Sequence, residues 1–500
     1  MAEGNRDSER WNRMLTWLRD EHGMEMGEEG LFIESKSTAG NCLWFSSPLS
    51  VKMRSFKNQE EDCLRQETVR THLQPSAQLL TIPSTALINV KTLASVYTSP
   101  YSLKGLTAVQ QMSLHLLMHR PEGEHDSLDP VFGPYLSTLP RNFDSHPLTW
   151  IVKLKRTGAK ASEMSMLESL PPSVTQSLRK LQDLFYEDWK AVSGHLTRNS
   201  NLLKKSTRQI TALPAFKHYD DLIDYSWAWL NVNTRSIYYP VQNLPSGNDN
   251  LTLCPILDFA NHTDGQSQII PRTEITSTPS SIVPRRRDDY TFFSWTNTVI
   301  GHDQELFLRY GGHANRTLFV QYGFVCPFPP NAIAEGDVRG EVDVQDLIED
   351  IFATSAIGSW IKTTLEDSGY WGDWTLDSLP LPAHPSYRLI TALRLFHLVA
   401  RLPGAPPCKL EAKIKPWRDV LSGKLDIIAD DNEQQWRASL LDICETIARR
   451  ARVGMRDAAT RLPYMTGWPA WMKNNIQTLW REELEVADAV AHSIRTGEEF

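Results

Sequence analysis

The stretch that decides the fold runs from residue 254 to residue 325 and opens with Cys254-Pro255-Ile256-Leu257-Asp258-Phe259-Ala260-Asn261-His262. It closes with Glu305-Leu306-Phe307-Leu308-Arg309-Tyr310-Gly311 and then with Gln321-Tyr322-Gly323-Phe324-Val325. Each part places polar side chains directly beside a short apolar run. Polar residues that directly follow a short strand often line a pocket at the end of that strand. We therefore expect the polar residues of this stretch to form the functional site.

The bulk composition sets the class of protein. A chain of 500 residues is too long for one hydrophobic core, so two or three domains are expected. With 41% hydrophobic and 22% charged residues, the composition is that of an ordinary globular protein. The net charge of -8 and the pI of about 6.0 argue against nucleic acid as the main partner. No apolar run has the length that a membrane span requires, so no membrane association is expected.

The cysteine pattern and the first residues bear on the compartment. The six cysteines are scattered without a C-x-x-C pair, which excludes a zinc ribbon or a redox motif of that type. Reduced thiols of this kind are typical of proteins of the cytoplasm or nucleus. The first residues are polar and charged and contain no apolar signal-peptide core. We therefore expect a soluble cytoplasmic or nuclear protein.

The hydrophobic periodicity divides the chain into β-rich and helical parts. Short apolar runs separated by turns precede residue 105, apolar residues at helical spacing dominate up to residue 236, and short runs then return up to residue 330. Four apolar helical stripes follow after Pro330. The pattern predicts an α+β fold. Its predicted parts are a first β-rich part (1–104) with a disordered insertion (51–78), a helical insert (105–236), a second β-rich part (237–330) and an all-α domain (331–500).

The common catalytic motifs are missing from the sequence. There is no G-x-x-x-x-G-K-[ST], no H-E-x-x-H, no G-x-S-x-G and no G-x-G-x-x-G after a strand. His262, His302 and His313 have no neighbours at ligand spacing, so we predict no metal site.

Six polar residues remain as candidates for chemistry. They are Asp258, Asn261 and His262 in one turn, Tyr310 and Tyr322 before glycines, and Arg235 at the end of a Trp-rich helix. Each also has a structural explanation. An Asp or Asn can cap a turn, a half-buried Tyr can belong to the core, and an Arg can complement a helix C-terminus.

Two of these segments resemble the signature motifs of SET-domain methyltransferases, in the class typified by the plant Rubisco large-subunit lysine methyltransferase. The first motif, D-x-x-N-H, is matched by Asp258, Asn261 and His262. The second reads as an apolar strand, Y-G, a few residues, Asn and then Y-G-F, and is matched over residues 307–324 with Asn315 as its asparagine. The segments 134–140 (PYLSTLP) and 227–235 resemble two further parts of the family, and the similarity covers nearly the whole chain.

The resemblance implies a β-rich SET domain interrupted by a helical insert and followed by an all-α substrate-binding domain. The family's first motif is a G-x-G turn, where glycine allows close backbone approach to the cofactor. Its best match is Gly40-Asn41-Cys42-Leu43, in which Cys42 replaces the second glycine. A side chain at this position narrows the cofactor site.

The resemblance also implies a role for each candidate residue. Tyr310 and Tyr322 would be catalytic, with the Tyr310 hydroxyl near the transferred methyl group and Tyr322 shaping the acceptor channel. The cofactor S-adenosylmethionine would be bound by Gly40, Leu43, Arg235, Asp258, Asn261, His262 and Tyr310. In this set Arg235 would pair with the methionine carboxylate, and Asp258 would brace the turn that carries Asn261.

The implied function is S-adenosylmethionine-dependent methylation of a lysine in a non-histone protein, such as a ribosomal or translation-related one. The substrate protein would dock on the helical domain of a monomeric enzyme. Two alternatives stay open. One is a protein-histidine methyltransferase, and the other is an inactive SET-fold scaffold, which the Cys42 departure favours.

Overall fold

The structure, a computed structural model, forms two compact units that are described separately. The first contains residues 1–143 and 183–312, and the second contains residues 144–182 and 313–500. The helix α8 (Pro172–Arg198) crosses the boundary between them. The structure describes residues 2–26, 30–36, 40–46, 72–73, 76–99, 101–155, 161–208, 219–240, 250–273, 289–294, 300–301, 304–333, 336, 338–400, 407–461 and 470–500.

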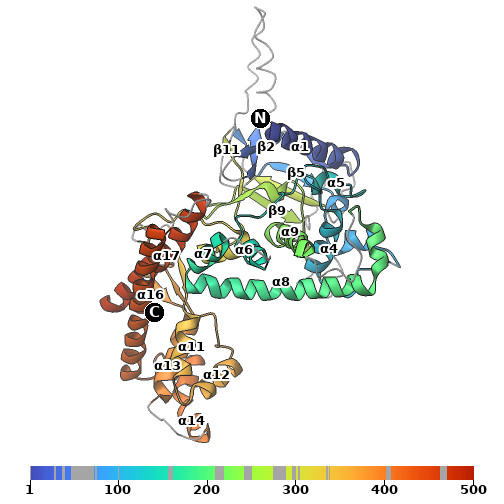
Figure 1. Cartoon of the computed structure of the whole chain (residues 1–500). Helices are drawn as coiled ribbons and strands as arrows, with labels where there is room; N and C mark the ends of the chain where they lie inside the picture. Colours follow the sequence, from blue (N-terminus) through green and yellow to red (C-terminus); the bar gives the residue numbers. More distant parts are fainter. Residues whose placement is uncertain are drawn as a thin grey trace, which may run out of the picture. The chain divides into compact units, whose positions relative to one another are not determined.

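The first unit combines short strands with helices, as Figure 1 shows. Its largest sheet has the strand order β1-β5-β10-β9 and is antiparallel throughout. The helices of this unit are α1 (Ala2–Asp20), α3 (Val90–Val96), α4 (Ala108–His119), α5 (Gly133–Leu136) and α9 (Tyr219–Arg235). Its strands are β1 (Glu25–Met26), β2 (Gly30–Lys36), β3 (Gly40–Ser46), β4 (His72–Leu73), β5 (Gln78–Ile82), β6 (Ile237–Tyr238), β7 (Leu251–Thr252), β8 (Asn261–His262), β9 (Ile269–Thr273), β10 (Tyr290–Ser294), β11 (Ile300–Gly301) and β12 (Phe307–Leu308). Within the described residues, the unit also contains the 3-10 helices η1 (Ser84–Ala86), η2 (Ser200–Lys205) and η4 (Leu257–Phe259).

The helix α4 is the central helix of the first unit. It begins with a capping box, in which Thr107 accepts a hydrogen bond from the backbone of Gln110 and the Gln110 side chain accepts one from the backbone of Thr107. Most of its residues are buried, as expected for a helix that is apolar on several sides. It packs against α9, and the buried Asp188 of α8 links the two by accepting hydrogen bonds from Gln110 and Trp229.

The second unit is mainly helical. Its helices are α6 (Pro147–Leu154), α7 (Ala161–Glu168), α10 (Asn315–Tyr322), α11 (Gln345–Ala353), α12 (Gly358–Asp367), α13 (Tyr387–Val399), α14 (Pro407–Lys413), α15 (Lys415–Leu421), α16 (Asp430–Arg461) and α17 (Ala470–Thr496). Trp374, Trp417 and Trp436 are almost fully buried in its core. The helices α16 and α17 lie side by side (Figure 1). None of the helices that the structure describes, in either unit, is long and apolar enough to cross a lipid bilayer.

The structure confirms the α+β class and adds a sheet to the region that we predicted to be all-α. The strands β13 (Glu341–Asp343), β14 (Thr375–Asp377) and β15 (His384–Pro385) pair antiparallel. Each has at most three residues, which is too short for an alternating pattern to stand out. The four predicted helical stripes are found in α11, α13, α16 and α17.

The predicted division into four parts stays a prediction. The compact units join residues 144–182 of the predicted helical insert with the C-terminal region, so they do not follow the predicted boundaries. Most of the predicted insertion at 51–78 lies outside the described residues. Within it, β4 pairs with β11, and β5 begins at Gln78.

Candidate active site

The turn at the start of the decisive stretch holds a buried carboxylate. Asp258 lies in η4, and its side chain has no exposed surface. The Tyr135 hydroxyl donates a hydrogen bond to Asp258 Oδ2 at 3.0 Å. Arg235 Nη1 lies 3.1 Å from the same oxygen and donates to the Asp258 backbone carbonyl at 2.8 Å. The last residue of α9 is thereby tied to the turn.

Burial governs the electrostatics of this turn. It raises the pKa of Asp258, although the Arg235 charge acts in the opposite direction. Burial also raises the pKa of Tyr135 well above its ordinary value, with the Asp258 charge adding to the effect. The same two causes raise the pKa of Cys254, so this thiol stays protonated at neutral pH and is a poor nucleophile.

The backbone just before Asp258 is strained. Ile256 has φ 72° and ψ -52°, a positive-φ conformation that β-branched residues rarely adopt, and its side chain is buried. A conformation of this kind costs roughly 1–3 kcal/mol and persists only where the surroundings fix it. Here the surroundings are the contacts of Asp258 with Tyr135 and Arg235. Such strain is concentrated at functional sites.

The strand β8 follows this turn and pairs in parallel with β12, which brings the two halves of the stretch together. Asn261 lies opposite Phe307 in this pairing, and His262 lies opposite Leu308. The Asn261 amide donates to Glu305 Oε1 at 2.7 Å. Two segments separated by more than forty residues in sequence thus meet in one short parallel pair.

Tyr310 lies just after β12 and contacts the same turn. Its hydroxyl donates to the Ala260 carbonyl at 2.9 Å, and its backbone N–H donates to His262 Nδ1 at 3.1 Å. Because Nδ1 accepts, the ring proton of neutral His262 sits on Nε2, 3.0 Å from Asp264 Oδ1. The hydrogen bond to Ala260 fixes the direction of the Tyr310 hydroxyl.

Arg235, Asp258, Asn261, His262 and Tyr310 are thus brought together in the first unit. The sequence did not assign a role to Tyr135, Glu305 or the Ala260 carbonyl. A signal for Tyr135 was present in the segment 134–140, which resembles a family motif. Sequence periodicity could not predict the contact between Tyr135 and Asp258, because the two residues are 123 positions apart in the chain.

Gly40 and Leu43 lie in β3, a neighbour of this turn. The strand pairs antiparallel with β2, with Gly40 opposite Lys36 and Leu43 opposite Ile33. It also contacts η4. The side chains of this strand, that of Cys42 included, lie outside the described residues. His302, one of the three histidines considered above, also lies outside them.

Tyr322 belongs to the second unit, where it ends α10. Burial raises its pKa. Gly323 follows in the left-handed conformation at φ 83°, and a Cβ there would lie 3.1 Å from His146 Cα. Asn315, the asparagine of the second motif, is buried and accepts a hydrogen bond from the Cys326 backbone. The motif residues therefore fix the chain on both sides of Tyr322.

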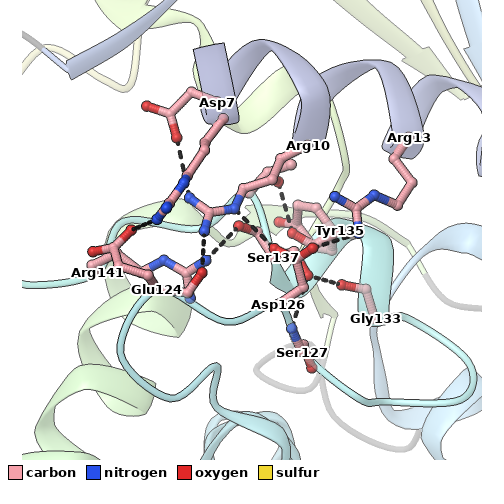
Figure 2. A network of polar contacts seen from close by, with 12 residues as sticks. Asp7, Arg10, Arg13, Glu124, Asp126, Ser127, Gly133, Tyr135, Ser137 and Arg141 are labelled. Atoms are coloured by element: carbon pink, nitrogen blue, oxygen red, sulfur yellow. Dashed lines mark hydrogen bonds and ion pairs between the residues drawn. The ribbon is translucent and has the colours of Figure 1, made fainter. Parts of the chain in front are cut away.

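The helix α1 contacts the turn and the loop before α5, and Figure 2 shows its polar contacts with that loop. Arg10 donates to Asp126 Oδ1 at 2.9 Å and to the Glu124 carbonyl at 2.8 Å, in the loop before α5. On the same helix, the Trp11 ring packs edge-on against Phe259 of η4, with 5.5 Å between ring centroids. The helix therefore contacts both the segment that leads to Tyr135 and the turn that carries Asp258.

Two buried atoms of this site lack a partner and fit the predicted cofactor. Arg235 Nε and Asp258 Oδ1 are buried and have no hydrogen-bond partner. Unpartnered buried polar atoms are costly unless a ligand satisfies them. A cationic N–H donor beside a carboxylate oxygen matches the carboxylate and ammonium groups of an amino-acid end, such as that of S-adenosylmethionine.

Comparisons with known proteins find a SET-domain protein and lysine methyltransferases among the relatives of this chain. No protein-family model matches the sequence. The chain is 25% identical over 439 residues to human SET domain-containing protein 4, covering 85% of each chain. It is 28% identical over 298 residues to the ribosomal lysine N-methyltransferase set11 of Schizosaccharomyces pombe, covering 59% of each. It is 23% identical over 313 residues to ribosomal lysine N-methyltransferase 2 of Saccharomyces cerevisiae, again covering 59% of each.

Solved structures decide the fold. The SET domain of LSMT bound to lysine and AdoHcy matches with a TM-score of 0.59 and 14% identity, covering 98% of this chain and 91% of that one. Rubisco LSMT bound to AdoMet matches with a TM-score of 0.58 and 14% identity, covering 98% and 92%. This chain has the SET-domain fold. The predicted resemblance to the Rubisco methyltransferase class is confirmed, and two of the relatives are named as lysine N-methyltransferases.

Proposed function

We propose that this chain is an S-adenosylmethionine-dependent protein-lysine N-methyltransferase that acts on a ribosomal protein. The observation that carries the proposal is the Tyr310 hydroxyl bonded to the Ala260 carbonyl, beside Asn261 and His262. The relatives named as ribosomal lysine N-methyltransferases supply the substrate class.

The residues of the turn would bind and orient the cofactor. When bound, S-adenosylmethionine supplies a methyl group on a positively charged sulfur. Arg235 Nε would pair with the carboxylate of its amino-acid end, and Asp258 Oδ1 would accept from its ammonium group. Both atoms are held in place before binding, because Asp258 Oδ2 and Arg235 Nη1 contact each other. Asn261 and His262 would contact the remainder of the cofactor from β8.

Tyr310 and Ala260 would position the acceptor amine. Transfer to an amine requires its lone pair to face the methyl group in line, and it requires no covalent enzyme intermediate. The hydroxyl oxygen of Tyr310 and the carbonyl of Ala260 are acceptors, and acceptors hold the N–H groups of a lysine amine in a fixed direction. Tyr322 would shape the channel that the amine enters.

The helical C-terminal region would dock the substrate protein on a monomeric enzyme. Docking remote from the reacting atoms supplies binding energy that orients the amine. We further propose that the enzyme works in the cytoplasm or nucleus, where ribosomal proteins are made and assembled.

A labelling experiment tests the proposal. The full-length protein is incubated with tritiated S-adenosylmethionine and a fractionated cell extract, and labelled proteins are identified by mass spectrometry. We expect label on a lysine of a ribosomal protein. Label on histidine would instead support the histidine alternative. Absence of both label and calorimetric binding of S-adenosylmethionine would support the inactive scaffold.

A further inference from the structure

A second polar cluster lies inside the first unit, apart from the residues given a role above. His115 and His119 lie one turn apart on α4, and Asp129 lies in the loop that follows. One ligand atom from each lies within 4.8 Å of the others. All three residues are buried, with 0%, 3% and 6% of their surface exposed. The cluster is therefore closed to solvent.

Both histidines are oriented by a partner on the same ring atom. His115 Nδ1 lies 2.8 Å from the Tyr97 hydroxyl, and His119 Nδ1 lies 3.2 Å from Thr207 Oγ1. The Nε2 atom of each ring is left to face the cluster, where the Tyr97 hydroxyl lies 3.5 Å from that of His119. Histidines that bind metals are held in this way, with one nitrogen fixed by an outer partner and the other on the ion.

Asp129 is also fixed by hydrogen bonds to one of its two carboxylate oxygens. Its Oδ1 accepts hydrogen bonds from the backbone of Val131 at 2.8 Å and of Phe132 at 3.3 Å. Its Oδ2 lies 2.8 Å from His115 Nε2, and neither of these two buried atoms has another partner.

We propose that His115, His119 and Asp129 bind a structural zinc ion. Imidazole nitrogens and a carboxylate oxygen are zinc ligands at about 2.0–2.2 Å, usually in tetrahedral geometry. A water molecule would complete the four positions. The ion would also offset the charge of a carboxylate that is otherwise buried beside two imidazoles. This proposal differs from our prediction of no metal site. Asp129 is brought close to the two histidines only by the fold, so the sequence spacing did not indicate it.

The position of the cluster gives the ion a structural role. It joins α4 to the loop that leads into α5, the helix that carries Tyr135. The same loop contains Ser127, whose hydroxyl donates to the His119 carbonyl and whose backbone donates to Ser137. An ion here would fix the segment that carries Tyr135 to α4, in addition to the contacts that α1 makes with the same segment. The inference does not depend on the proposed function.

Metal analysis of the full-length protein tests the proposal. We expect about one zinc per chain by mass spectrometry of the purified protein. Stripping with a chelator should lower the melting temperature by about 5 °C, and zinc chloride, but not magnesium chloride, should restore it. His119→Gln and Asp129→Asn should each bring the zinc content below about one tenth per chain. His195→Gln should leave it unchanged, because His195 is equally buried but bonds to the Ser102 carbonyl.

Two results would overturn the proposal. One is a wild-type protein, grown with added zinc, that holds less than about one tenth of an ion and whose melting temperature does not change with zinc chloride. The cluster would then be a buried network of Tyr97, His115 and Asp129. The other is a zinc content that His119→Gln and Asp129→Asn leave unchanged, which would place the ion elsewhere. The zinc content of the wild-type protein still tests the proposal if a variant does not fold.

Discussion

Asp258 links the chemistry of the site to its architecture. Its Oδ2 contacts Tyr135 and Arg235 from two different helices, and the strained backbone of Ile256 turns it toward both. A fully buried carboxylate is stable only with such partners. Asp258 therefore does more than cap a turn, and the turn that it fixes carries Ala260, Asn261 and His262.

Asn261→Ala should weaken binding of S-adenosylmethionine. Loss of one polar contact to the cofactor costs about 1–1.5 kcal/mol, so we expect the Kd to rise about tenfold. Titration calorimetry measures it. Glu305→Ala is the matched control, since it removes the partner of the Asn261 amide and leaves the amide in place. If both variants lowered affinity equally, the effect of Asn261 would depend on its hydrogen bond with Glu305.

The sequence predicted the individual site residues better than their partners. Asp258, Asn261, His262 and Tyr310 stand in two short motifs, and the structure brings them together in one parallel strand pair. Their assigned roles stay predictions. The partners come from remote segments and are set by tertiary packing, which local spacing does not encode.

At the scale of single elements, α1 stands out because it contacts the site through buried polar and apolar groups together. The Arg10 side chain is 8% exposed, although its guanidinium is charged. Its contacts with Asp126 and Glu124 offset the cost of burying that charge. The buried arginine on the inner side of this helix was not predicted from the sequence, because arginine is rarely buried unless it is paired.

Arg10→Ala should lower the free energy of unfolding by about 2–3 kcal/mol, because it removes a buried guanidinium that donates to Asp126 and to the Glu124 carbonyl. Urea denaturation measures the change. Arg13→Ala is the control, because Arg13 contacts the same Asp126 carboxylate but its side chain is 51% exposed. Its effect should stay below about 1 kcal/mol. Equal losses in the two variants would show that burial of Arg10 has no special importance.

Gly323→Ala should destabilise the end of α10 by about 2–4 kcal/mol. The residue would have to keep φ 83° with a side chain, and its Cβ would approach the His146 backbone. Gly369→Ala separates the two causes, because Gly369 has φ 76° and nothing within 4 Å of an added Cβ. We expect it to cost only about 1 kcal/mol in the same urea measurement. A Gly323→Ala variant no less stable than Gly369→Ala would contradict the close approach.

The short strands mark the limit of prediction at this scale. Long amphipathic helices such as α13 and α16 follow from apolar stripes that repeat over several turns. The strands β13 to β15 hold three residues or fewer, and the pair of β8 with β12 holds two residues on each side. Such short segments carry too few alternations to be recognised, and their pairing depends on contacts distant in sequence.

At the scale of the whole chain, stability is tied to pH through two buried acids of α17. Burial raises the pKa of Glu482 to about 8 and that of Glu483 to about 7. The folded state then holds protons that the unfolded state, with a glutamate pKa of about 4.3, releases. Their contribution to stability is complete below about pH 4.3 and is lost as the pH rises through the folded pKa values.

Glu482→Gln should therefore flatten the pH dependence of stability. Between pH 5 and 8 the free energy of unfolding of the wild type should fall by on the order of 1–3 kcal/mol more than that of the variant. Urea denaturation at a series of pH values measures both slopes. Glu499→Gln, at an exposed position after the same helix, should keep the wild-type slope. The interpretation fails if Glu482→Gln retains the wild-type slope as well.

Methyl transfer by the wild type and by Tyr310→Phe tests the proposed function most directly. The substitution removes the hydroxyl that donates to Ala260 and leaves the ring in place. Transfer of labelled methyl groups to purified ribosomal proteins is measured alongside the Kd of S-adenosylmethionine. We expect lysine methylation by the wild type, a fall of at least about 100-fold in Tyr310→Phe and an unchanged Kd. Equal transfer by both proteins, or binding of the cofactor without transfer by the wild type, would contradict the proposal.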